Sequence, residues 1–191
     1  MLKFSFSSIA LVLTISAISM SSQILAQKHP AGGAATDVSN AQIQAALKKT
    51  ASAGVSDQQL RVVDIDGEYN VAVGILHRAK TNGKPSGALI HEKITEVYQI
   101  LSGDGTFVTG GTLVNPKESA ADSEIVKVLA GPSISGSAIQ DGVSRKVGPG
   151  DIIVVPPNTA HGFSEITSDQ IVYSVIRVDS HKVLPAGYAA K

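Results

Sequence analysis

The 191-residue sequence contains no cysteine and no tryptophan, and only four phenylalanines and four tyrosines. The absence of cysteine excludes a disulfide framework, a lipoprotein anchor and a cysteine nucleophile. The sequence also lacks a Gly-x-Ser-x-Gly nucleophile turn and a glycine-rich phosphate loop ending in Lys-Ser/Thr. These absences argue against covalent catalysis by the usual routes.

The sequence also has no formal net charge, since it contains 16 basic and 16 acidic residues. A neutral chain has no long-range field that would attract nucleic acid or an anionic membrane. We therefore expect neither as a partner, and expect function to lie in a pocket for a small-molecule substrate. With no tryptophan and no cluster of arginines, the sequence does not indicate which substrate this is.

The N-terminal segment is typical of an export signal. Lys3 is the only charged residue before Lys28, and an apolar, serine-rich run lies between them. Its seven serines and one threonine argue against a membrane anchor. We expect residues 1–26 to be a signal peptide cleaved after Ala26, which makes the mature protein secreted or periplasmic.

The mature chain divides into a short helical start and a long β-rich part. Residues 27–58 are expected to form an arm and a short helix over residues 40–53, because Ser39 and Gln42 fit a capping box. From Gln59 onward the apolar residues alternate with period two and are often β-branched.

This pattern predicts an all-β sandwich or barrel over residues 59–180, followed by a C-terminal tail at residues 181–191. Residues 115–142 are the least regular part and fit either a loop or an irregular edge strand. The candidate strands are residues 60–65, 69–78, 88–92, 96–101, 105–109, 124–128, 152–155, 161–166 and 170–178.

Three polar side chains fall on strand faces that we expect to be buried. Alternation aligns His91 with Leu89 and Glu96 with Tyr98, and a hairpin of these two strands would bring His91 and Glu96 together. His161 lies on a strand far downstream. A buried imidazole or carboxylate needs a partner, commonly a divalent cation, and two imidazoles with one carboxylate are sufficient to hold one.

The spacing of these residues resembles the two motifs of the cupin superfamily over roughly residues 60–180. The first motif, Gly-x5-His-x-His-x4-Glu-x6-Gly, is matched in spacing by Gly83, Leu89, His91, Glu96 and Gly103. The second, Gly-x5-Pro-x-Gly-x2-His-x3-Asn, is matched by Gly150, Pro156, Asn158, His161 and Glu165. The resemblance implies a cupin-type double-stranded β-helix, which is a jelly-roll barrel, here with a short N-terminal helix.

The resemblance also implies that His91, Glu96 and His161 are metal ligands. Leu89 stands where the family has its first histidine. Three alternatives follow: a site with three ligands, a site completed by His77, or a barrel that has lost its metal. His77 ends an alternating apolar run, so it either faces the cavity or is an ordinary histidine at a strand end.

Tyr98 shares the face of Glu96. Its phenol is a candidate catalytic proton donor or orienting group, and the alternative is a core tyrosine with its hydroxyl on a partner. The resemblance implies a divalent metal such as iron, manganese, nickel or zinc, and a homodimer. We predict a metal-dependent enzyme, most simply a dioxygenase, with isomerase or lyase chemistry also open. The alternative is a non-enzymatic module that binds a small molecule or sugar.

Overall fold

A computed structural model of the chain describes residues 34–190. The expected signal peptide, residues 1–26, lies outside the described residues, as does the start of the arm that follows it. Among residues 34–190 there is no helix with the length and hydropathy needed to cross a bilayer.

The predicted capping box begins the single α-helix of the described chain, α1 (Asn40–Lys49). The Gln42 backbone N–H donates to Ser39 Oγ, and the Ser39 backbone N–H donates to Gln42 Oε1 at 3.0 Å. The helix ends at Lys49, earlier than predicted, and the first strand begins at Val55 rather than at residue 60. The prediction missed the start of this strand because its residues are polar, although Ser56 and Gln59 are buried there.

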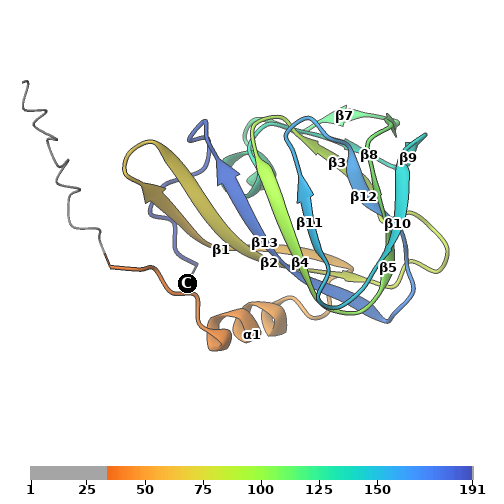
Figure 1. The fold of residues 1–191 in the computed structure, drawn as a ribbon, viewed down its shortest axis with the longest axis horizontal. Coiled ribbons are helices and arrows are strands. Elements are labelled where there is room, and N and C mark those ends of the chain that lie inside the picture. Colours follow the sequence, from red (N-terminus) through yellow and green to blue (C-terminus); the bar gives the residue numbers. More distant parts are fainter. Residues whose placement is uncertain (1–33, 191) are drawn as a thin grey trace, which may run out of the picture. The chain divides into compact units, whose positions relative to one another are not determined.

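Thirteen strands follow in residues 34–190 (Figure 1). They are β1 (Val55–Ile65), β2 (Tyr69–Ala79), β3 (Ala88–His91), β4 (Thr95–Ser102), β5 (Gly105–Thr109), β6 (Thr112–Val114), β7 (Lys117–Glu118), β8 (Ser133–Gly136), β9 (Ala138–Gln140), β10 (Val143–Val147), β11 (Ile152–Val155), β12 (His161–Ile166) and β13 (Gln170–Asp179). One sheet has the order β1-β2-β13-β4-β11, and a second has the order β10-β5-β12-β3-β8-β7. Strands β6 and β9 form a separate pair.

The pairing of these strands is nested. β2 pairs with β13, β3 with β12, β4 with β11 and β5 with β10, and successive pairs alternate between the two large sheets. Every one of these pairs is antiparallel. An antiparallel ribbon folded in this way is a jelly roll, which confirms the predicted all-β barrel with its short N-terminal helix.

The main core lies between the two large sheets. Phe107, Phe163 and Tyr173 are almost fully buried there. The ring centroid of Phe163 lies 4.9 Å from that of Phe107 and 5.8 Å from that of Tyr173. A second cluster lies on the outer face of β1, β2 and β13, where α1 packs Ile43 and Leu47 against buried strand residues. Strand β2 is therefore buried on both faces, so alternation alone does not reveal which face is interior.

Residues 115–142 contain the main errors of the sequence prediction. The strand predicted at residues 124–128 is wrong, because Ile125–Leu129 forms a π-helical turn, η1, closed by the bond from the Ala130 N–H to the Ile125 carbonyl. Its β-branched residues favour a strand locally, but they have no neighbouring strand to pair with. The short strands β7, β8 and β9, which the prediction left as a loop or irregular edge, are held by their partner strands, which include β3 and β6.

The C-terminal segment is packed onto the barrel. Leu184 is buried, and its backbone N–H and that of Val183 donate to the Asp179 carboxylate. Beyond it, the Ala190 N–H donates to the Leu60 carbonyl, and Tyr188 accepts from the Val62 N–H. This segment therefore lies along the free edge of β1, which would otherwise expose unpaired backbone groups.

Candidate metal centre

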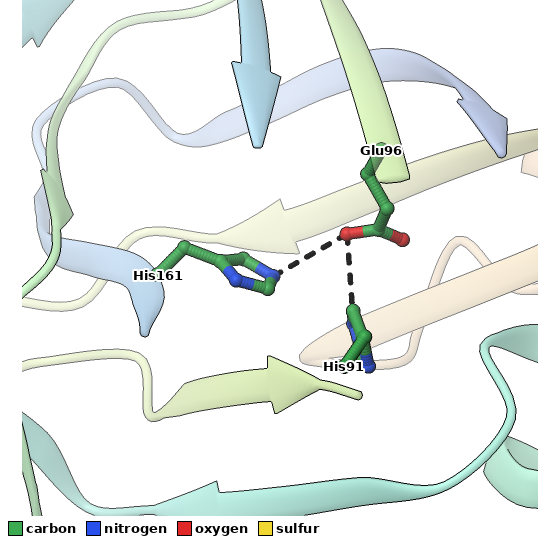
Figure 2. Close-up of side chains that lie close together, drawn as sticks. All are labelled: His91, Glu96 and His161. Atoms are coloured by element: carbon green, nitrogen blue, oxygen red, sulfur yellow. Dashed lines mark ion pairs between the residues drawn. The ribbon is translucent and has the colours of Figure 1, made fainter. Parts of the chain in front are cut away.

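His91, Glu96 and His161 meet inside the barrel (Figure 2). The two histidines come from β3 and β12 of one sheet, and Glu96 comes from β4 of the other. The expected hairpin is therefore wrong in detail: β3 and β4 belong to different sheets, and the side chains meet across the interior. Glu96 Oε2 lies 3.5 Å from His91 Nε2 and 3.3 Å from His161 Nε2, and all three side chains are at most 4% exposed.

Hydrogen bonds on the far side of each imidazole assign its tautomer. His161 Nδ1 lies 2.9 Å from the Thr159 carbonyl oxygen, which can only accept, so this nitrogen carries the proton. His91 Nδ1 lies 2.7 Å from Ser133 Oγ, whose own hydroxyl donates to the Gly131 carbonyl. His91 Nδ1 is therefore also the protonated nitrogen, and both Nε2 lone pairs face Glu96.

This arrangement could hold a cation. Burial lowers the pKa of His91 to about 4, against the partial opposition of the Glu96 charge. Burial tends to raise the pKa of Glu96, but the positive charges of His91, when that imidazole is protonated, and of Arg177 outweigh it and hold this pKa well below its usual value. In these tautomers Glu96 Oε2 faces the Nε2 lone pairs of both imidazoles, and the buried His161 Nε2 has no hydrogen-bond partner. Such a contact is repulsive unless a positive ion lies between the three groups.

The spacing of the three atoms fits one ion. Two ligand atoms that each lie about 2.1 Å from a metal, at angles between octahedral and tetrahedral, are separated by roughly 3.0–3.4 Å. The separations from Glu96 Oε2, 3.3 and 3.5 Å, lie at and just above the upper end of this range. Fixing the Nδ1–H of each histidine through Ser133 and Thr159 is the usual way in which proteins orient metal-binding imidazoles.

His77 is not brought to this cluster. Its neighbour Leu76 belongs to the core between the sheets, so His77 points to the opposite face, which α1 covers. There it is 3% exposed, and its Nε2 lies 2.8 Å from the Ala53 carbonyl oxygen. His77 is thus a hydrogen-bonded histidine beneath the helix, and the structure offers no support for it as a fourth ligand.

The hydroxyl of Tyr98 points into the cluster. It donates to Glu96 Oε2 at 2.5 Å, while its ring packs edge-on against Phe107 and beside Tyr173. Burial and the nearby Glu96 charge raise the pKa of Tyr98 well above its usual value, so the phenol keeps its proton. Tyr98 is therefore both a core residue and a hydrogen-bond donor to the candidate ligand.

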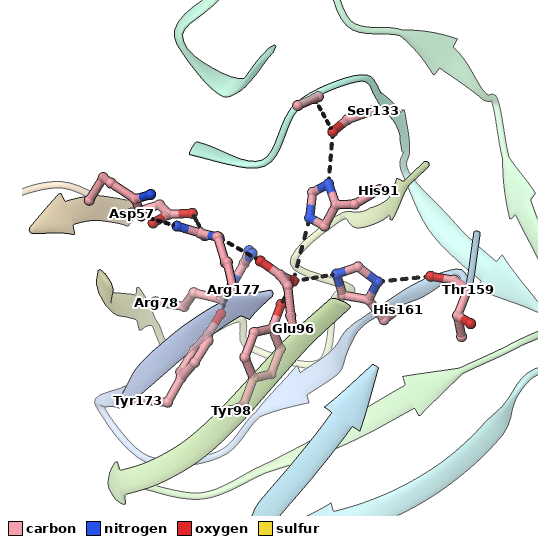
Figure 3. A network of polar contacts seen from close by, with 12 residues as sticks. Asp57, Arg78, His91, Glu96, Tyr98, Ser133, Thr159, His161, Tyr173 and Arg177 are labelled. Carbon is pink, nitrogen blue, oxygen red and sulfur yellow. Dashed lines mark hydrogen bonds and ion pairs between the residues drawn. The ribbon is translucent and has the colours of Figure 1, made fainter. Parts of the chain in front are cut away.

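Sequence reasoning missed Arg177, which the structure places against Glu96 (Figure 3). The side chain is 1% exposed and comes from β13. Its Nε donates to Glu96 Oε1 at 2.9 Å. The available signal was alternation, since Arg177 continues the face of the buried Tyr173 and Val175. A charge that continues a buried face needs a buried partner.

Comparisons with known proteins concern the fold. No family model and no curated protein matches the sequence. Its structural neighbours include cupins. A cupin protein from Bacteroides fragilis is 18% identical, over 62% of this chain and 72% of that one, at a TM-score of 0.37. The BH2720 protein of Bacillus halodurans is 13% identical, over 82% and 89% of the two chains, at a TM-score of 0.46.

An oxalate oxidase solved with the substrate analogue glycolate is 16% identical at a TM-score of 0.40. The match covers 67% of this chain and 52% of that one, so the chain spans about half the length of the oxidase. At these TM-scores the likenesses are too loose to assign an activity, which has to be argued from the residues of the site.

Replacing Leu89 with histidine is expected to strengthen metal binding about tenfold. Leu89 is paired directly opposite His161 and lies two residues before His91 on the same strand face, so a new imidazole would enter the cluster. Isothermal titration with Zn²⁺ measures the effect. Ile90→His, on the other face of the same strand, is the control; equal affinity gains in both variants would mean that the cluster is not involved.

Proposed function

We propose that the protein is a metal-dependent enzyme that acts on a small-molecule substrate, with dioxygenase-type chemistry. The observation that carries this proposal is the pair of Nε2 lone pairs directed at one buried carboxylate oxygen. Two histidines and one carboxylate form the ligand set of non-haem Fe(II) oxygenases. A bound divalent ion would supply open positions for substrate and dioxygen.

The residues of the chain have separate roles in this proposal. His91, His161 and Glu96 hold the ion, and Ser133 and Thr159 keep each imidazole in the tautomer that binds metal. Tyr98 holds a proton on its phenol next to the ligand oxygen. If the phenol turned its single O–H away from Glu96, it could donate a hydrogen bond to a group bound at the ion, which is the catalytic role proposed for Tyr98.

The test begins with anaerobic loading of the mature protein with Fe²⁺, followed by nitric oxide as a stand-in for dioxygen. We expect one Fe²⁺ per chain and an iron–nitrosyl signal in electron paramagnetic resonance, because three protein ligands leave positions free. His91→Ala should lose both. Iron that binds without forming a nitrosyl adduct would contradict oxygenase chemistry.

The alternative is a non-enzymatic module that binds a small molecule or sugar, with or without a metal. Without a metal, it predicts that the wild type and His91→Ala retain equally little of any divalent ion, and that a small molecule binds equally well to both. Metal analysis of the purified proteins tests this metal-free form. Substrate-dependent oxygen uptake by the iron-loaded wild type would then identify the reaction as oxygenation.

A further inference from the structure

Arg177 is a cation enclosed by three acceptors (Figure 3). Besides the bond from Nε to Glu96 Oε1, its Nη1 donates to Gln59 Oε1 at 2.8 Å and its Nη2 to Asp57 Oδ2 at 2.5 Å. All three guanidinium nitrogens are therefore engaged by the protein. A side chain held in this way is not available to bind substrate, so its role must be exerted on the groups that it touches.

The contact with Arg177 gives the two oxygens of the Glu96 carboxylate different partners. Oε1 accepts from Arg177, while Oε2 faces the two imidazoles. An ion held by both oxygens would have to displace the guanidinium from Oε1. On the basis of the proposed metal site, we infer that Arg177 is a positioning residue that fixes Glu96 as a ligand through one oxygen only.

Asp57 explains how Glu96 keeps its attraction for a cation beside a buried arginine. Alone with Glu96, the guanidinium would neutralise the carboxylate and weaken its pull on a metal. Here Arg177 is shared between two carboxylates, so the three charges sum to minus one before an ion binds. Arg177 therefore orients Glu96 without cancelling its charge.

Gly74 provides the space for this arrangement. Strand β2 lies between β13, which carries Arg177, and β1, which carries Asp57, and Gly74 is paired with Val175 on one side and Gln59 on the other. A Cβ on Gly74 would lie 3.2 Å from Arg177 Nη1, 2.9 Å from Val175 Cγ1 and 3.1 Å from the Gln58 carbonyl oxygen. Gly74 does not have a positive φ, so the need for space explains the glycine.

The inference is tested with Co²⁺, whose affinity and visible absorption report ligand number and geometry. Arg177→Met combined with Asp57→Asn removes the clamp and keeps the net charge of the group at minus one, with Glu96 still accepting the hydrogen bond from Tyr98. We expect about 10- to 100-fold weaker Co²⁺ binding and a changed absorption spectrum, because Glu96 is free to rotate or to bind through both oxygens. The single variant Arg177→Lys keeps the positive charge but cannot contact all three acceptors. Its Co²⁺ affinity should lie between that of the wild type and that of the double variant.

Gly74→Ala tests the same inference with the ligands and Arg177 all present. The added methyl would press on Val175, on the Gln58 carbonyl and on the guanidinium, and a shift of Arg177 by a few tenths of an ångström should weaken Co²⁺ binding in the same direction, by up to about tenfold. The matched control is Arg78→Met, since Arg78 donates to Tyr173 rather than to Glu96. Its Co²⁺ affinity should stay within about threefold of wild type.

The outcomes separate two failures. If the wild type binds no Co²⁺, the proposed metal site is wrong, and the role of Arg177 is wrong with it. If the wild type binds Co²⁺ and the Arg177→Met/Asp57→Asn variant binds it with the same affinity and spectrum, the metal site stands and the positioning role is overturned. A variant that only melts at a lower temperature, with unchanged Co²⁺ binding when folded, would likewise make Arg177 merely structural.

Discussion

Glu96→Gln is expected to abolish tight metal binding and to destabilise the protein in the same step. The amide removes the single anionic ligand of the cluster, so divalent-metal affinity should fall by more than about 100-fold. It also leaves the guanidinium of Arg177 with one carboxylate partner instead of two. Removing one partner from a buried ion pair costs about 3–5 kcal/mol; the sharing with Asp57, and the relief of the contact between Oε2 and the two imidazole lone pairs, place the expected loss at or below the lower value.

Both effects can be read from one preparation. Urea unfolding in the presence of a chelator gives the free energy of unfolding, and Zn²⁺ titration of the folded variant gives the affinity. The matched control is Glu165→Gln, because Glu165 lies on β12 near His161 in sequence but outside the cluster. If Glu96→Gln kept wild-type affinity, the carboxylate would not be a ligand.

Without metal, the protein is expected to lose stability as the pH falls from about 6.5 to about 4. The pKa of His91 is about 4 in the folded protein and 6.5 when unperturbed, because burial disfavours the charged imidazole. Between these values the unfolded chain binds a proton that the folded chain does not, so unfolding becomes easier as protons are added. A difference of about 2.5 units corresponds to about 3 kcal/mol.

Glu96 acts in the same direction at lower pH. Its folded-state pKa is well below 4.5, so the unfolded carboxylate takes up a proton first as the pH drops through this value. Urea unfolding in chelator at pH 7, 5.5 and 4.5 measures the slope. His91→Gln should flatten the slope between pH 6.5 and 4.5, and the control His181→Gln, at an exposed position, should leave it unchanged. Equal slopes in wild type and His91→Gln would show that the imidazole is not buried in its neutral form.

The candidate ligands could be predicted from the sequence because they occupy fixed positions in the two motifs. His91, Glu96 and His161 stand at fixed distances from turn residues, and the turns fix the strands. Asn158 shows the same logic: it replaces a glycine of the motif, adopts a positive φ of 60°, and its backbone N–H donates to the His91 carbonyl. This bond ties the turn of the second motif to the strand of the first.

The sequence analysis missed Arg177 and left two interpretations of His77 open, because the deciding information is long-range. Arg177 meets Asp57 across 120 positions of sequence and two strand pairings, and no local pattern records that contact. The face of β2 that carries His77 has apolar residues, as a face inside the barrel would, because α1 packs against it. The segment η1 has the composition of a strand, and only the absence of a pairing partner among the described residues shows that it is not one.

The central claim is that one metal ion lies between His91, Glu96 and His161. Crystals of the protein grown with Mn²⁺ test it directly through anomalous scattering. The account predicts a single strong peak about 2.0–2.3 Å from both Nε2 atoms and from one oxygen of Glu96, with the other oxygen still on Arg177. A cluster without such a peak, with Mn²⁺ bound only at surface carboxylates, would contradict the account.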